Sequence, residues 1–247
     1  MRSSNPALSE KTFKDLGLAD AKMTIDGTVN KSLFLILAVF LMGFWTWQMA
    51  YPGGWSPEAI PVIPVWYFPV IGVSFVLSLV IIFKKTTAPY LAPIYALLQG
   101  ASLGAISALF EARFPGIVMQ AVLCTFGTFF ALLMAYKSRM IKVTENFKLG
   151  VVAATGGIAI VYLIDFVLMF MGKRVPFIHE GGPVGIAVSL FVTAIAALNL
   201  VLDFDFIEKG AEQGAPKYME WYASFGLLVT LIWLYLEFLR LLGKSRK

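Results

Sequence analysis

Long apolar runs separated by short polar segments dominate this chain. A membrane-spanning helix needs about 20 consecutive, mostly apolar residues, and seven runs approach that length. They cover residues 32–51, 60–83, 86–110, 114–136, 149–172 and 181–202, followed by a last run that starts near Trp221. This pattern predicts an all-α integral membrane protein, built as a bundle of seven transmembrane helices.

The composition of the chain supports the same class of protein. Of the 247 residues, 59% are hydrophobic and 14% are charged, whereas an ordinary soluble domain has about 25% charged residues. This argues against a soluble globular enzyme and against a disordered chain. Residues 1–30 are polar and lack the apolar core of a signal peptide. We expect them to form a polar cytoplasmic tail and residues 31–247 to form the transmembrane domain.

The basic residues predict the orientation, because cytoplasmic loops of membrane proteins are enriched in Lys and Arg. The chain has 20 Lys and Arg against 15 Asp and Glu, which gives a net charge of +5. Thirteen of the basic residues fall on the side of the N-terminus: Arg2, Lys11, Lys14, Lys22, Lys31, Lys84, Lys85, Lys137, Arg139, Lys142, Lys148, Lys209 and Lys217. The loops on the other side carry only Arg113, Lys173 and Arg174. We therefore expect a cytoplasmic N-terminus, and lipid rather than nucleic acid as the partner of this basic chain.

Seven spans would place the C-terminus on the outer side of the membrane. The basic residues 244–247 argue weakly against that side. A re-entrant last segment, which would return the C-terminus to the cytoplasm, is therefore kept as the alternative.

Two residue counts argue against common kinds of site. The only Cys, Cys124, lies within an apolar run, and the only His, His179, lies in a polar stretch. One Cys cannot form an internal disulfide, and a lone Cys and His do not suit a zinc site or a catalytic triad. We interpret Cys124 as a packing residue and His179 as a solvated loop residue, and we expect no cofactor.

Small residues predict where helices approach one another. Gly100 and Gly104 form a GxxxG pattern, and Gly150, Gly156 and Gly157 lie in the fifth run. Small side chains allow close packing of helix backbones in lipid. Both sets are therefore interpreted as packing positions.

Carboxylates inside the apolar runs need an explanation, because a charged residue at the centre of a spanning helix costs about 2.5–3.5 kcal/mol on insertion scales. Counting about 1.5 Å per helical residue sorts these acids into two layers. The layer near the N-terminal side holds Asp203, Asp205, Glu208 and Glu220, and the layer near the opposite side holds Glu111, Asp165 and Glu237. Because Asp165 lies deep in its run, we expect it to act in permeation or gating. Asn199, Glu111 and Glu220 are further candidates for an ion path.

The direction of each side chain matters as much as its depth. Residues two apart on a helix point about 160° away from each other, so Asp203 and Asp205 cannot both face the bundle interior. Asn199 is four residues before Asp203 and shares its face. We expect Asn199 and Asp203 to face inward, and Asp205 and Glu208 to face the cytoplasmic mouth.

Buried acids of this kind suit a pH-sensitive cation gate. Carboxylate oxygens are the natural ligands of calcium, and a carboxylate in apolar surroundings can change its charge near physiological pH. Asp203 and Asp205 are therefore candidate calcium ligands at such a gate.

Simple ion pairing is the alternative interpretation of the same acids. The two acids at the mouth could pair with Lys209 and Lys217 in the headgroup region. Glu237 could form a local pair with Arg240, three residues further on.

An intramembrane aspartyl protease is the enzyme class that fits best, because it needs two Asp at one depth that share a proton. The depth count separates Asp165 and Asp203 by about 20 Å, and the chain has no GxGD motif. Asp203 and Asp205 also form a DxD motif, which binds metal in soluble sugar transferases, but here it ends a spanning run. We therefore expect no enzymatic activity.

A series of short motifs runs in order along most of the chain. It comprises Asn5-Pro6 and MTIDGTV at 23–29, APIYA at 92–96 before Gly100, LGAIS at 103–107, TFGTF at 125–129, NLVLDFDFI at 199–207, and LYLEF with LRLLG at 234–243. Together with the seven-span frame, these motifs resemble the transmembrane Bax-inhibitor-motif family, in particular its bacterial YccA-like members.

The resemblance implies a bundle with the last helix at its centre and a pH-sensitive calcium leak across a bacterial inner (plasma) membrane. In that family an aspartate late in the sixth span and one in the seventh act together as pH sensor and gate. The sixth-span acid resembles Asp203 or Asp205. The seventh-span position is Glu237, which keeps the acid but is one methylene longer. A link of YccA-like proteins to a membrane protease implies a second function, a non-transporting regulator that binds other membrane proteins.

The resemblance and the depth count disagree at one point. A latch needs Asp203 and Glu237 in contact, whereas the count places them in different layers. The disagreement shrinks if residues 216–224 lie at the interface and the last helix starts near Leu227, because Glu237 would then be about 15 Å deep.

Overall fold

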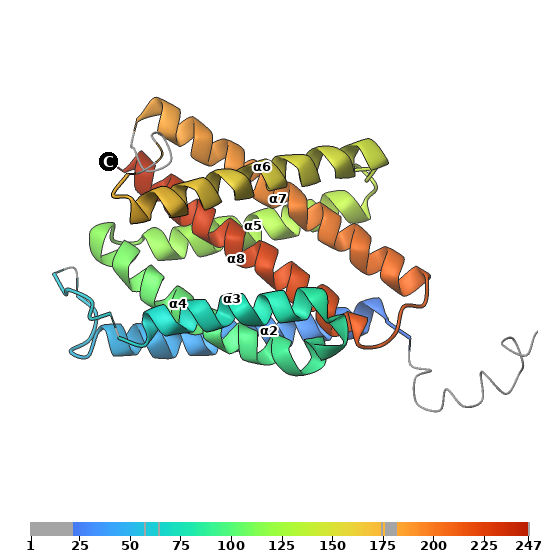
Figure 1. Ribbon diagram of the computed structural model, residues 1–247, viewed down its shortest axis with the longest axis horizontal. Coiled ribbons are helices and arrows are strands. Elements are labelled where there is room, and N and C mark those ends of the chain that lie inside the picture. The colour runs from blue at the N-terminus through green and yellow to red at the C-terminus, as the bar shows by residue number, and fades with distance from the viewer. Residues whose placement is uncertain (1–21, 57, 64, 174, 176–181, 247) are drawn as a thin grey trace, which may run out of the picture.

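The computed structural model describes residues 22–56, 58–63, 65–173, 175 and 182–246. Helices make up most of this part of the chain (Figure 1). They are α2 (Ile25–Ala50), α3 (Tyr67–Phe83), α4 (Ala88–Arg113), α5 (Ile117–Lys137), α6 (Glu145–Phe170), α7 (Pro183–Glu212) and α8 (Met219–Ser245), with a short 3-10 helix, η2 (Lys85–Thr87), between α3 and α4.

The predicted all-α membrane bundle of seven helices is confirmed. Every α-helix except α3 is long and apolar enough to cross a membrane. The 17 residues of α3 are apolar too, and at about 1.5 Å per residue they span roughly 25 Å. The start of α2 and the end of α8 lie at opposite ends of the bundle (Figure 1). The last segment is a continuous helix of 27 residues, so it does not turn back as a re-entrant segment would.

Several helix boundaries differ from the sequence prediction, among them the start of α3, which lies at Tyr67 and not at residue 60. α2 begins at Ile25, inside the predicted tail, because the Thr24 side chain accepts a hydrogen bond from the Gly27 N–H and caps the helix. α7 extends to Glu212, well past the predicted end at residue 202. α8 begins at Met219, so the proposed start near Leu227 is wrong. Residues 1–21 of the predicted tail lie outside the described residues.

The last helix is the central one, as the family resemblance implies. α8 packs against α2, α4, α5 and α7, and it crosses the middle of the bundle in Figure 1. Its buried residues run from Glu220 in the first turn to Lys244 in the last. Polar groups on such a helix must find their partners inside the bundle.

Glycine packing is confirmed for one predicted set and wrong for the other. A Cβ added at Gly100 or Gly104 of α4 would lie 2.5 or 2.3 Å from a backbone oxygen of α2, so only glycine permits this helix contact. A Cβ added at Gly150, Gly156 or Gly157 of α6 would meet nothing within 4 Å. The glycines of α6 therefore leave open space beside that helix.

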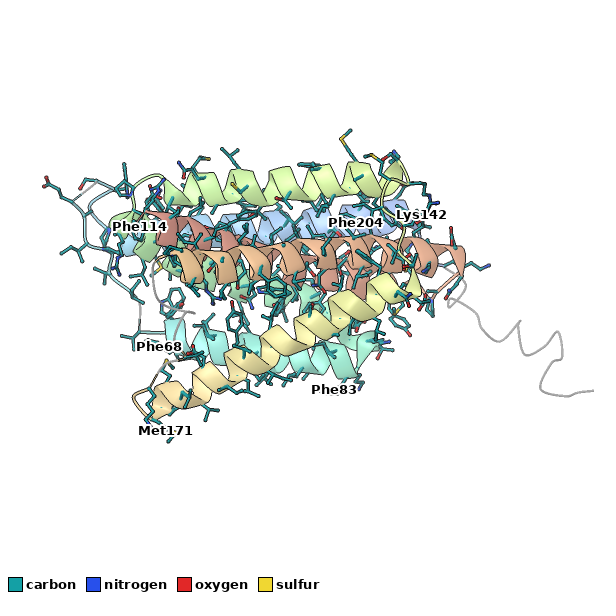
Figure 2. All side chains as sticks on the ribbon, turned by 90° about the horizontal axis from the view of Figure 1, so that it is seen from above. Phe68, Phe83, Phe114, Lys142, Met171 and Phe204 are labelled. Atoms are coloured by element: carbon teal, nitrogen blue, oxygen red, sulfur yellow. The ribbon has the colours of Figure 1, made fainter. Side chains whose placement is uncertain are left out.

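α6 leaves the bundle towards its C-terminal end. Figure 2 shows Met171, just after α6, far from Phe114, although both lie towards the same end of the bundle. The side chains of Leu163, Phe166 and Phe170 are all more than half exposed. In a membrane protein such an apolar surface faces lipid.

Candidate functional site

Asp203 faces the central helix. It lies nine residues before the end of α7, which is about 14 Å inside the helix and deeper than the sequence prediction placed it. Its Oδ1 lies 4.0 Å from the position of a Cβ on Gly226, and Thr230, whose hydroxyl donates to Gly226 O at 3.3 Å, is its neighbour one turn further along α8. Its Oδ2 is buried and has no hydrogen-bond partner within the described part of the chain.

Asp205 points towards different elements. The Lys209 Nζ donates to its Oδ2 at 2.7 Å, and the Lys148 Nζ at the start of α6 lies 3.4 Å from the same oxygen. Asn199 donates to Thr155 Oγ1 of α6 at 2.8 Å. The two aspartates thus diverge as the helix geometry predicts, with Asp203 at α8 and Asp205 at a pair of lysines.

Glu208 belongs to the same end of α7. It accepts hydrogen bonds from the Tyr136 hydroxyl and from Arg139, whose Nη2 lies 2.7 Å from Oε1. The proposed partner Lys217 is instead 3.6 Å from Glu220. Ion pairs therefore join the end of α7 to the end of α5 and to the start of α6.

Glu237 is almost completely buried, with its side chain 1% exposed. Its Oε1 accepts hydrogen bonds from Arg240 Nη1 at 2.8 Å, Tyr162 Oη at 2.9 Å and Trp233 Nε1 at 3.1 Å. Arg240 Nη1 also donates to Tyr162 Oη at 3.0 Å. The local pair with Arg240 is present, and a tyrosine from α6 joins it to the neighbouring helix.

Asp203 and Glu237 lie at different heights along α8. Thr230, the neighbour of Asp203, comes seven residues before Glu237, a separation of about 10 Å along the helix. Because α8 is helical from Met219 onwards, no later start brings the two acids together. In this structure each acid has its own partners.

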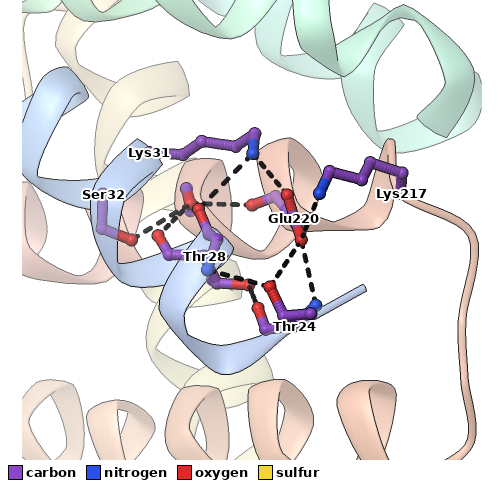
Figure 3. A network of polar contacts seen from close by, with 8 residues as sticks. Thr24, Thr28, Lys31, Ser32, Lys217 and Glu220 are labelled. Atoms are coloured by element: carbon purple, nitrogen blue, oxygen red, sulfur yellow. Dashed lines mark hydrogen bonds and ion pairs between the residues drawn. The ribbon is translucent and has the colours of Figure 1, made fainter. Parts of the chain in front are cut away.

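Glu220 is the most enclosed acid at the other end of α8, with its side chain 0% exposed. Figure 3 shows it surrounded by donors from the start of α2: the Thr24 N–H and hydroxyl, each at 3.0 Å, and the Lys31 Nζ. A Cβ on Gly27 would lie within 2.3–2.7 Å of the carboxylate. This carboxylate fastens α2 to α8 and has little room for another ligand.

Glu111 and Asp165 both bind backbone N–H groups. Glu111 accepts from the Gly116 N–H at 2.5 Å and the Val118 N–H at 3.1 Å, so it caps the start of α5. Asp165 accepts from the Val175 N–H at 2.9 Å, in the segment that follows α6. These contacts hold chain reversals at the end of the bundle where α8 finishes.

No group of three or more possible metal ligands forms among the residues that the structure describes. The carboxylates of Asp203 and Asp205 face different elements, so they do not converge on one ion-binding position. A calcium ion would therefore meet one of them at a time.

Several partners of these acids have little signal in the sequence. Lys31 counted only towards orientation, although a Lys at the start of an apolar run is a signal for a buried partner. Tyr162 and Thr230 lie inside apolar runs and were not singled out. Cys124 is half-buried on α5, and His179 lies outside the described residues.

These observations define a multi-pass membrane protein whose acids gather around a central helix. The chain matches the family described as Bax inhibitor 1 like over residues 5–247, and it belongs to that family. No protein with a curated description is significantly similar to it. The resemblance to the Bax-inhibitor family is thus confirmed, and the bacterial YccA-like assignment stays a prediction.

Proposed function

We propose that this protein is a pH-sensitive cation leak channel with calcium as the permeant ion and without an enzymatic step. Asp203 and Glu237 are the acids that set its pH response. The observation that carries the proposal is the buried Oδ2 of Asp203, which has no partner within the described residues and lies beside the central helix. Membership of the Bax inhibitor 1 like family supports the same function.

Asp203 suits this role better than Asp205. Asp205 is paired with Lys209 and Lys148, so its charge is already compensated. Gly226 and Thr230, which lie beside Asp203 on α8, are neutral. An ionised carboxylate in such a place attracts a cation or water, because a buried charge needs compensation.

Glu237 forms the second level of the proposed path. Its negative charge holds Arg240 at 2.8 Å, close to the end of α8. Protonation of Glu237 would weaken this charge-assisted hydrogen bond and release Arg240. Asp203 of α7 and Glu237 of α8 then respond to pH at two different heights along α8, without direct contact.

The test is calcium flux into liposomes at neutral and mildly acidic pH. Asp203→Asn mimics the protonated acid, so its flux at neutral pH should shift towards the acidic flux of the wild type. Glu237→Gln should also reduce the pH response. Asp205→Asn is the matched control on the same helix and should keep the response.

Two results would contradict the proposal in different ways. Absence of flux at every pH would remove the channel function and favour a non-transporting regulator that binds membrane proteins. Flux with an unchanged pH response in Asp203→Asn and Glu237→Gln would leave the channel but remove the proposed gate.

A further inference from the structure

A cavity between α6, α7 and α8 combines apolar walls with two basic side chains. Its volume is about 400 Å³, within the range of about 300–1,000 Å³ that is usual for ligand sites. Ala154, Gly157 and Val161 line it from α6, and Val188 lines it from α7, while Arg240 and Lys244 of α8 reach it as well. Charge at one end and apolar walls elsewhere are the features that recognise an amphiphile.

The basic end of the cavity lies where the spans end. Arg240 and Lys244 are five residues and one residue before Ser245, the last residue of α8, or about 8 and 2 Å from its end. Gly157 is 12 residues into α6, near the middle of the membrane at about 18 Å. A lipid with its headgroup at the interface and its chain pointing inwards has the same polarity.

Arg240 is well placed to meet an anion. Its side chain is 43% exposed, and its contacts with Glu237 and Tyr162 use only Nη1. Nε and Nη2 have no hydrogen bond among the described residues. Glu237 compensates the guanidinium on its Nη1 side, and the remaining fork of Nε and Nη2 matches the geometry of a phosphate group.

Lys244 adds a second positive charge at the same end. Its Nζ donates to Gly185 O at 3.0 Å and to Ser189 Oγ at 2.7 Å. These bonds fix the ammonium group at the start of α7. Basic pockets between transmembrane helices are typical sites for anionic lipid headgroups.

Gly157, which has no side chain, leaves space for the apolar part of the cavity. A Cβ on Gly157 would meet nothing within 4 Å, and α6 leans away from the bundle towards Met171 (Figure 2). A second cavity of about 410 Å³, between α2, α4, α5 and α8, has no charged lining residue. It offers no means of choosing between lipid headgroups.

We propose that the cavity between α6, α7 and α8 binds an anionic phospholipid, with its phosphate against Arg240 and Lys244 and an acyl chain along Gly157 and Val161. The site requires neither calcium flux nor a pH response, so it stands independently of the channel function.

Native mass spectrometry of the purified full chain tests the site with two probes, phosphatidylglycerol and phosphatidylcholine that carry identical acyl chains. The wild type should retain phosphatidylglycerol about tenfold better, because both lipids carry the phosphate but the choline cation of phosphatidylcholine meets the two basic side chains with like charge. Arg240→Gln should remove most of this preference. Arg246→Gln, which loses contacts to the α4–α5 turn and to the first turn of α5, should keep it.

A glycine pair tests the apolar part without touching any charge. Gly157→Leu fills the cavity, whereas Gly156→Leu adds the same side chain to open space on α6 outside it. Only Gly157→Leu should lower phosphatidylglycerol retention. This pair decides the matter even if Arg240→Gln, which leaves Glu237 without its cation, does not fold.

Three results would overturn the site. One is equal retention of the two lipids by the wild type. Another is wild-type retention by Gly157→Leu. The third is displacement of the lipid by glycerol phosphate at equal concentration, because this probe has the headgroup chemistry but no acyl chain.

Discussion

At the scale of single residues, the acids of this protein differ in what compensates their charge. Glu220 is enclosed by Lys31 and Thr24, and Glu237 by Arg240, Tyr162 and a tryptophan. Asp203 stands apart, because its Oδ2 has no partner within the described residues. The few buried acids of this chain are therefore not equivalent: Glu220 and Glu237 have a cationic partner, and Asp203 is the acid with an oxygen unpaired among the described residues.

The pair of Lys31 and Glu220 should be a major contributor to stability. Lys31→Met leaves Glu220 buried without its cation and should lower the free energy of unfolding by about 3 kcal/mol. Lys217→Met, which removes a side chain that is 54% exposed and 3.6 Å away, should cost less than about 1 kcal/mol. Thermal unfolding in detergent, followed by circular dichroism, gives the comparison.

A double variant checks the cause of that loss. Lys31→Met combined with Glu220→Gln leaves no uncompensated charge, so it should recover part of the stability lost by Lys31→Met alone. If the two losses simply add, the pair is not coupled and the explanation is wrong.

At the scale of helices, contact between α2 and α4 depends on glycine, whereas Gly157 of α6 borders a cavity. The sequence pattern cannot separate the two cases, because Gly104 and Gly157 are both small residues in apolar runs. What differs is the neighbour: a backbone oxygen at 2.3 Å in one case and open space in the other. The same residue type thus supports packing on α4 and leaves a binding volume on α6.

Gly104→Val should separate α2 from α4. Its Cβ would lie 2.3 Å from Gly43 O, and such overpacking typically costs about 1–3 kcal/mol. Gly127→Val on α5 is the matched control, since a Cβ there meets nothing within 4 Å. Melting temperatures of the two variants in detergent provide the measurement, and an equal decrease in both would show that helix propensity, rather than packing, explains the loss.

At the scale of the whole molecule, seven crossings place the two ends of the described chain at opposite ends of the bundle (Figure 1). The excess of Lys and Arg on the side of the N-terminus predicts which end faces the cytoplasm. The cavity with Arg240 and Lys244 would then open near the outer leaflet, and the ion pairs of Asp205 and Glu208 would face the cytoplasm.

Single cysteines can test this orientation in a Cys124→Ala background. Ser245→Cys at the end of α8 should react with a membrane-impermeant maleimide in intact cells. Ser138→Cys, which follows α5 at the other end and is also exposed, should react only after permeabilisation. Labelling of Ser138→Cys alone in intact cells would reverse the orientation.

The sequence by itself determined the class of protein and the number of spans, because both follow from local runs of apolar residues. It also found most of the acids that the bundle encloses, since a charge inside such a run is conspicuous. The depth count correctly separated Asp203 from Glu237, and helix geometry correctly separated Asp203 from Asp205.

Only the tertiary structure decided which partner each acid has. Glu220 binds Thr24 across 196 residues of sequence, and Glu237 binds Tyr162 across 75. These contacts depend on which helices lie side by side and how they are rotated, and apolar runs carry little of that information. The end of α7 was missed for a related reason: its polar residues indicate a loop when their partners, such as Lys148 of α6 and Arg139 after α5, come from other parts of the chain.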